Sequence, residues 1–70
     1  MPLTMVNSGE TVGISRITGT DVVRQHLTEL GFIVGDKVTV VSNVGGNLIV
    51  QVKDARIALD MKMANRIMAA

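Results

Sequence analysis

The side chains best suited to bind a metal ion lie together on one predicted helix. Asp21, His26 and Glu29 offer oxygen and nitrogen donors, and His26 and Glu29 are three residues apart and so share a helix face. Two donors are fewer than structural or catalytic zinc takes from a protein. Weak Fe²⁺ or Zn²⁺ binding is therefore expected only if Asp21, or a residue of another subunit, completes the site. Otherwise the pair is an ordinary part of a helix surface.

The same helix offers little for catalysis. A nucleophilic mechanism needs a base beside the nucleophile, and His26 is the only histidine in a chain that has no cysteine. Nothing in the sequence places a serine beside His26. We therefore expect no catalytic residues and no enzyme activity.

Two groups of residues are candidates for contact with a protein partner. Val41 and Ile49 are expected as neighbours on the outer face of a hairpin, where an apolar spot could receive a partner. Arg24 and His26 are expected on the exposed side of the helix. Since isolated apolar residues are common on surfaces, Val41 and Ile49 could equally do no more than stabilise the sheet.

The composition argues against several other partners. Phe32 is the only aromatic residue, so the chain cannot build an aromatic groove for proline-rich peptides or a stacking platform for single-stranded nucleic acid. The net charge is +1 and no run of Lys or Arg exists, so no nucleic acid partner is expected. Whether the chain forms homo-oligomers is open.

The expected location follows from the apolar runs. The longest uninterrupted run, residues 67–70, is far shorter than the about 20 residues that a membrane-spanning helix needs, so no membrane insertion is expected. The first residues have neither a basic start nor an apolar core, so no secretion signal is visible. We therefore expect a cytoplasmic protein.

One helix is expected after the first strand. Thr20 is a plausible N-cap, and Val23, Leu27 and Leu30 follow with the spacing of a buried helical stripe. Gly31 stands where a left-handed C-terminal residue is needed, and Phe32 can then fold back on Leu27, as in a Schellman motif.

The rest of the chain is typical of short strands. A strand over residues 11–18 should contain a bulge near Ser15-Arg16, because Ile17 has the opposite parity to Val12 and Ile14. Alternation then predicts three further strands and the turns between them, and Asp60 can cap a helical turn over residues 61–64. The inward residues should be Val38, Val40, Val44, Leu48, Val50, Val52, Ile57 and Leu59, with turns at Gly45-Gly46-Asn47 and Asp54-Ala55 and a last strand at Ile67-Met68.

These elements predict a mainly β fold: one domain, residues 1–70, forming a small SH3-like barrel of about five short strands, because a short chain of successive hairpins covers its sheet edges most readily by closing into a barrel. One α-helix follows the first long strand, and a short helical turn lies near the C-terminus. An OB-type barrel is the main alternative.

The order of short motifs resembles the ferrous iron transport protein A (FeoA) family. The hallmark leucine-x-x-leucine-glycine, followed by three residues and a second glycine, corresponds to residues 27–35. The isoleucine-alanine-leucine of the family corresponds to residues 57–59, and the closing alanine-x-x-isoleucine to residues 64–67. The chain departs from the family where it has His26 in place of an arginine, and Val34 and the Gly45-Gly46-Asn47 turn in place of prolines.

The resemblance implies a small cytosolic accessory or regulatory protein of bacterial ferrous iron uptake. Such proteins are thought to contact the cytoplasmic side of the membrane permease FeoB, which carries a GTPase domain. The same barrel forms the C-terminal domain of iron-dependent repressors. A transition-metal sensor or carrier using Asp21, His26 and Glu29, or a stand-alone barrel like that repressor domain, is the alternative function.

Overall fold

The computed structural model describes all of residues 1–70 and is mainly β, as the sequence predicts. Five strands and two short α-helices make up most of the chain, and a single 3-10 turn precedes them. In chain order the elements are η1 (Leu3–Met5), β1 (Thr11–Ile17), α1 (Asp21–Glu29), β2 (Lys37–Val44), β3 (Asn47–Val52), β4 (Ala55–Asp60), α2 (Met61–Ala64) and β5 (Ile67–Ala69).

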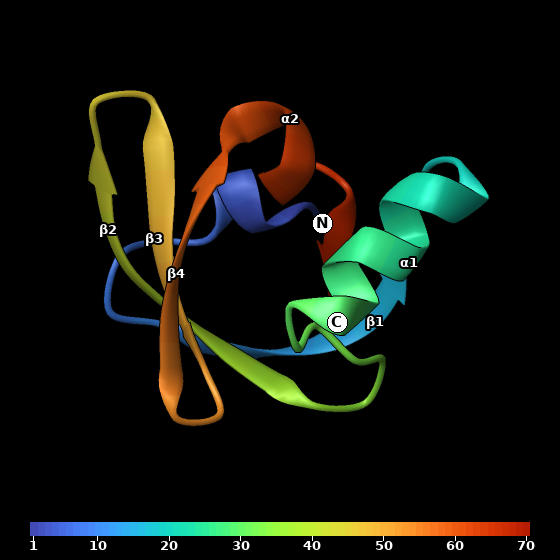
Figure 1. Ribbon diagram of the computed structural model, residues 1–70. Coiled ribbons are helices and arrows are strands. Elements are labelled where there is room, and N and C mark those ends of the chain that lie inside the picture. The colour runs from blue at the N-terminus through green and yellow to red at the C-terminus, as the bar shows by residue number, and fades with distance from the viewer.

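The strands form one antiparallel sheet in the order β4-β3-β2-β1-β5, which curls around the core (Figure 1). Helix α1 stands across the core from β3 and β4, and α2 lies beside η1. The start of the chain covers the outer edge of β5, where Pro2 pairs with Met68. Strand β4 is the other end of the sheet, and no strand pairs with its outer edge.

Helix α1 ends in the Schellman motif that the sequence predicts. Gly31 has φ of +111°, and its N–H donates to the Thr28 carbonyl at 3.0 Å. The Phe32 N–H donates to the Leu27 carbonyl at 3.1 Å, which is the second bond of the motif. Phe32 and Leu27 are both fully buried in the core. The glycine thus turns the chain so that the only aromatic ring enters the barrel.

The core is entirely apolar and draws on every element. Fourteen residues are buried, none of them polar or charged. Val23 of α1 and Leu30, the C-cap residue of that helix, pack against them while remaining half-buried. The buried residues are Leu3, Val6, Ile14, Leu27, Phe32, Val38, Val40, Leu48, Val50, Val52, Leu59, Ala64, Ile67 and Ala69.

Two bulges set which side chains face inward. The register of β1 against β5 shifts between Ile14 and Arg16, where the sequence predicts a bulge, and Ile17 packs against the core. A second shift lies between Val40 and Ser42 of β2. It reverses the alternation beyond Val41, so Val44 points outward and is 59% exposed. The prediction that Val44 faces the core was wrong for this reason.

Two tight turns connect the three-strand part of the sheet. Val44 pairs with Asn47 across Gly45-Gly46, and both glycines have positive φ, which a two-residue hairpin of this twist requires. Val52 pairs with Ala55, so the second turn is residues 53–54 and not Asp54-Ala55 as predicted. At the other end of β4, the Asp60 carboxylate accepts the Met63 N–H at 2.8 Å and caps α2, as expected.

Candidate functional site

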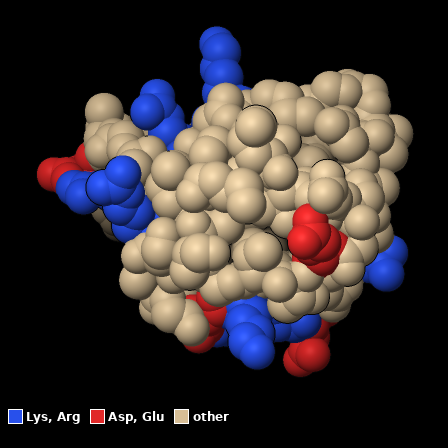
Figure 2. Space-filling view, turned by 180° about the vertical axis from the view of Figure 1, so that it is seen from behind, with Lys and Arg blue, Asp and Glu red and all other residues tan.

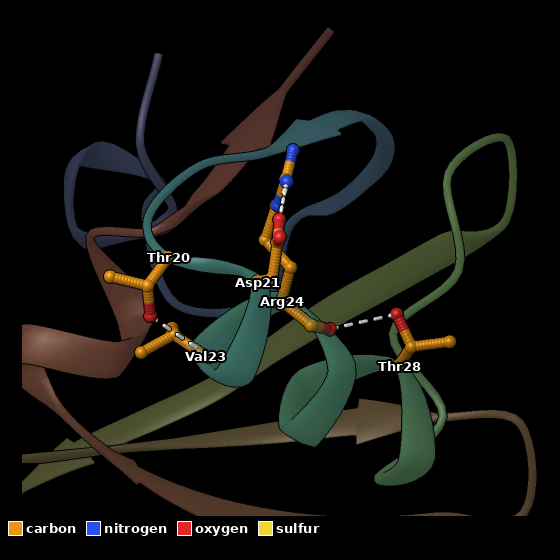
Figure 3. Close-up of polar contacts among 5 residues, drawn as sticks. All are labelled: Thr20, Asp21, Val23, Arg24 and Thr28. Carbon is orange, nitrogen blue, oxygen red and sulfur yellow. Dashed lines mark hydrogen bonds and ion pairs between the residues drawn. The ribbon is translucent and has the colours of Figure 1, made fainter.

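The first candidate surface is the exposed side of α1, which we call the helix surface and define by Asp21, Arg24, His26 and Glu29. All four side chains are exposed. Arg24 forms an ion pair with Asp21, and the Thr28 hydroxyl donates to the Arg24 carbonyl at 2.9 Å (Figure 3). At the start of the helix the Thr20 hydroxyl accepts the Val23 N–H at 3.3 Å, which confirms the predicted N-cap.

The helix surface does not gather its donors around one point. The Asp21 carboxylate forms an ion pair with Arg24, and a Glu29 carboxylate oxygen accepts a hydrogen bond from the Gln25 amide at 3.2 Å. No group of three His, Asp or Glu side chains in the structure is close enough to hold a metal ion. Asp21, His26 and Glu29 therefore lie on one helix without forming a three-ligand site within the chain, and metal binding by them stays a prediction.

The second candidate surface, which we call the hairpin surface, consists of Val41 and Ile49. The register places Ser42, and not Val41, opposite Ile49, because Val41 is the extra residue of the β2 bulge. On its other side Ile49 pairs with Ala58 of β4. Val41 and Ile49 are each half-buried, less exposed than the sequence suggested. Because no pocket opens on the molecule, these apolar side chains suit contact with a protein more than binding of a small molecule.

Charge is spread over the molecule. The face seen from behind is mostly neutral, with charged side chains chiefly along its rim (Figure 2). Besides Asp21–Arg24, one further ion pair joins Lys53, in the β3–β4 turn, to Asp36 at 2.7 Å. Both of its side chains are about half exposed. No pocket opens on the surface, so the candidate sites are surfaces and not cavities.

Three apolar residues on and directly after α1 are exposed without an indication from the sequence that they form a surface. Val22 on α1, and Ile33 and Val34 directly after the Schellman motif, are 78%, 42% and 57% exposed. Helical spacing could have identified Val22, since it falls outside the Val23-Leu27-Leu30 stripe. Ile33 and Val34 lie in a turn that is closed by the Asp36 N–H donating to the Ile33 carbonyl. The Gly35 N–H also donates to the Ile14 carbonyl of β1 at 2.9 Å, and that long-range contact is not visible in the sequence.

The family model described as the FeoA domain matches residues 1–70 of the chain. The chain belongs to the FeoA family. This family is associated with ferrous iron transport and consists of small accessory domains, not of known enzymes. The resemblance carried by the motifs between Leu27 and Ile67 is thereby confirmed. No curated protein sequence matches the chain significantly.

Solved structures of FeoA proteins share the whole fold. A crystal structure described as an iron uptake regulatory protein (FeoA) is 28% identical, with a TM-score of 0.90 over 99% of this chain and 92% of that one. FeoA of Stenotrophomonas maltophilia, solved with zinc, is 30% identical, with a TM-score of 0.86 over 100% of this chain and 89% of that one. It is described as a prokaryotic SH3 domain protein and a candidate activating factor for bacterial ferrous iron transport. The FeoA fold is therefore the predicted SH3-like barrel, and not an OB-type barrel.

A similar barrel lies within a longer chain described as a manganese-dependent transcriptional repressor, with a TM-score of 0.85 at 18% identity over 96% of this chain and 39% of that one. A protein described as T. acidophilum IdeR is 28% identical, with a TM-score of 0.86 over 99% of this chain but only 32% of that one. This chain thus spans about a third of that protein. In the FeoA chain itself, no helix is long and apolar enough to cross a membrane.

Proposed function

We propose that this FeoA protein is a cytosolic accessory subunit of bacterial ferrous iron uptake that acts by contact with a transporter of the FeoB type. The observation that carries the proposal is the match of the FeoA family over all 70 residues. The description of the 30% identical S. maltophilia protein as a candidate transport-activating factor supports it. The partner contact is assigned to the cytoplasmic side of the permease.

Two surfaces are proposed to make this contact. On the hairpin surface, Val41 and Ile49 are half-buried apolar residues on a rigid sheet, so their contact area costs little conformational entropy on binding. On the helix surface, Arg24 and His26 are exposed, and Arg24 is held in place by Asp21. Because α1 stands across the core from β3, the helix surface would make a separate contact from the hairpin surface. Exposed charged side chains in such a contact contribute mainly orientation and association rate.

A binding assay with the cytoplasmic domain of the cognate FeoB-type permease tests the hairpin surface. The double variant Val41→Asp plus Ile49→Asp should abolish binding, because two carboxylates would be desolvated in the contact. Val44→Asp is the matched control, since it adds a carboxylate to the same hairpin at an exposed site and should leave binding unchanged. Because Val41 and Ile49 are half-buried, Val41→Ser plus Ile49→Thr provides a milder pair, and circular dichroism checks the fold of each variant.

The helix surface needs its own comparison. Arg24→Glu should weaken binding to the same permease domain, whereas Arg16→Glu, the same change on the exposed side of β1, should not. If both variant sets bind as tightly as the unchanged chain, the contact lies elsewhere. If the unchanged chain itself shows no binding to the permease domain, the proposed partner is wrong.

A second candidate function is metal sensing or carriage, which the zinc-bound S. maltophilia relative favours. In this chain Asp21, His26 and Glu29 are the candidate ligands, and they would need a donor from a second molecule because they do not converge. Calorimetric titration with ZnCl₂, and with Fe²⁺ under anaerobic conditions, tests the idea. Binding that His26→Ala removes would support it, and the absence of both heat and a melting shift would reject it.

The barrel shared with metal-dependent repressors gives this second candidate a structural precedent only. The chain matches about a third of the T. acidophilum protein. A stand-alone barrel with a repressor-like role would have to act through protein contacts. The permease binding assay therefore also separates the transporter accessory function from a repressor-like function, because a repressor-like module has no reason to bind the transporter.

A further inference from the structure

Strand β4 leaves one edge of the sheet open. The sheet has two end strands, and the edge of β5 is covered by the start of the chain through the Pro2–Met68 bridge. Nothing pairs with the outer edge of β4, which is six residues long and lies at the end of the β3–β4 hairpin (Figure 1). An open edge of this kind is a template for another strand.

The register identifies which backbone groups are free. Val52 and Ala55 close the two-residue turn, so Ala55, Ile57 and Leu59 are the residues whose backbone bonds run to β3. The N–H and C=O groups of the alternate residues, Arg56 and Ala58, therefore point away from the sheet. No turn or loop bond uses them either. Side chains of these same residues lie on the outer face and are exposed.

The charges on this edge are placed symmetrically. Arg56 lies two residues before Ala58 and Asp60 lies two residues after it, and both side chains are exposed. One oxygen of the Asp60 carboxylate accepts the Met63 N–H at the start of α2, and the second oxygen has no partner within the chain. In an antiparallel pair of identical strands centred on Ala58, Arg56 of each copy stands opposite Asp60 of the other. A pair centred on Arg56 or on Asp60 would instead place like charges opposite each other, which is unfavourable. The charge pattern thus favours one register of self-pairing.

We propose that two copies of the chain pair through β4, antiparallel and centred on Ala58, to form a two-fold symmetric dimer with a continuous sheet. The contact is isologous, so each favourable charge pair occurs twice. Charges usually protect an open edge by repelling a second copy. Here the opposite signs on either side of Ala58 have the reverse effect, because each charge meets its complement.

The rest of the outer face is compatible with this pairing. Ile49 lies beside Ala58 on the neighbouring strand, so the two copies would place a short apolar row across the symmetry axis with alanines at its centre. The Gln51 amide oxygen accepts from Arg56 Nε at 3.0 Å, which holds the guanidinium on the outer face and leaves its terminal nitrogens free. The contact is one strand wide, so the dimer is weak and concentration-dependent.

Sedimentation equilibrium measures the association directly, with loading from about 10 µM to about 1 mM because small interfaces bind weakly. The unchanged chain should dimerise within this range. Arg56→Glu places a carboxylate opposite Asp60 of the second copy at both pairs and should raise the dissociation constant about tenfold or more. Arg16→Glu makes the same charge change on β1, an internal strand, and should leave the constant unchanged.

A cross-linking measurement locates the contact. The chain has no cysteine, so Ala58→Cys introduces a single thiol at the proposed symmetry axis. Residues opposite each other at such a position have Cα atoms about 5.5 Å apart, within the range of a disulfide. Under mild oxidation Ala58→Cys should form a covalent dimer, while Arg16→Cys at the same concentration should form it at least about tenfold more slowly.

Three results would overturn the proposal. The first is an unchanged chain that remains monomeric at the highest concentration, which would leave the β4 edge to a strand of another protein. The second is a dimer that Arg56→Glu and Arg16→Glu affect equally, and the third is equal cross-linking rates at positions 58 and 16. If Arg56→Glu fails to fold, the cross-linking comparison decides, since Ala58 is exposed and its replacement by cysteine is small.

Discussion

Replacement of Gly31 by alanine should destabilise the protein through backbone strain alone. Gly31 has φ of +111°, a value that residues with a side chain rarely adopt. A Cβ added at this position would meet Val52 Cγ1 at 3.7 Å as its nearest neighbour, which is ordinary van der Waals contact. A Cβ at this position therefore causes no steric clash, and the cost of the substitution comes from the backbone conformation.

The magnitude follows from two opposing terms. Holding a non-glycine residue in a sparsely populated backbone region costs about 1–3 kcal/mol. Alanine also lowers the conformational entropy of the unfolded chain, which raises the unfolding free energy by about 0.4–1 kcal/mol. Taken at the middle of each range, the net loss in unfolding free energy is about 1.3 kcal/mol, and it is at most about 2.6 kcal/mol. Each kcal/mol lowers Tm by about 4–8 °C in a domain of this size.

Gly13→Ala is the matched control for this experiment. Gly13 lies in β1 with no positive φ, and a Cβ there would have Ala70 Cβ as its nearest neighbour at 3.9 Å. With no strain, only the unfolded-state term remains, so Gly13→Ala should raise the unfolding free energy by about 0.4–1 kcal/mol. Thermal melts followed by circular dichroism should show Tm shifts of opposite sign for the two variants.

A third variant separates strain from crowding. Asparagine is larger than alanine but tolerates positive φ better, so Gly31→Asn should be less destabilising than Gly31→Ala. If Gly31→Asn is the worse of the two, crowding against Val52 dominates. If Gly31→Ala melts with the unchanged chain, the left-handed cap does not stabilise the fold and the reasoning fails.

Further predictions concern the core, a cap and an ion pair. Leu27→Ala should cost about 2–5 kcal/mol in chemical denaturation because Leu27 is fully buried; a loss below 1 kcal/mol would contradict its place in the core. Asp60→Ala should cost about 1 kcal/mol by removing the α2 cap, while Asp60→Asn, which can still accept the Met63 N–H, should cost clearly less. Arg24→Ala should change unfolding free energy by no more than about 0.5 kcal/mol, since the ion pair with Asp21 is exposed; a larger loss would show that the helix surface also stabilises the fold.

Local signals in the sequence predicted most of the architecture. The end of α1 is determined by neighbouring residues, since both bonds of the Schellman motif join residues no more than five apart, and the motif was found at Gly31. The α2 cap at Asp60 is equally local. The β1 bulge left a visible parity change at Ile17, and it was found where that change predicts it.

The errors arise where two strands jointly decide the outcome. Val41 interrupts the alternation of β2, but the sequence alone does not distinguish a misplaced outward valine from an inserted residue. The register against β3 resolves this, since Val40 pairs with Val50 and Ser42 with Ile49. Once Val41 is an insertion, Val44 must face outward, and the error at Val44 follows from that single residue.

The surfaces were harder to predict than the core for a related reason. Burial is detectable from periodicity, whereas the openness of a sheet edge depends on which strand ends the sheet. The alternation of Ile57 and Leu59 predicts β4 equally well in the middle of a sheet or at its end. Only the order β4-β3-β2-β1-β5 shows that the backbone groups of Arg56 and Ala58 have no partner. Once the edge is located, the opposite charges at positions 56 and 60 indicate the register of self-pairing, because a strand can pair with its own copy only in a register that its charges permit.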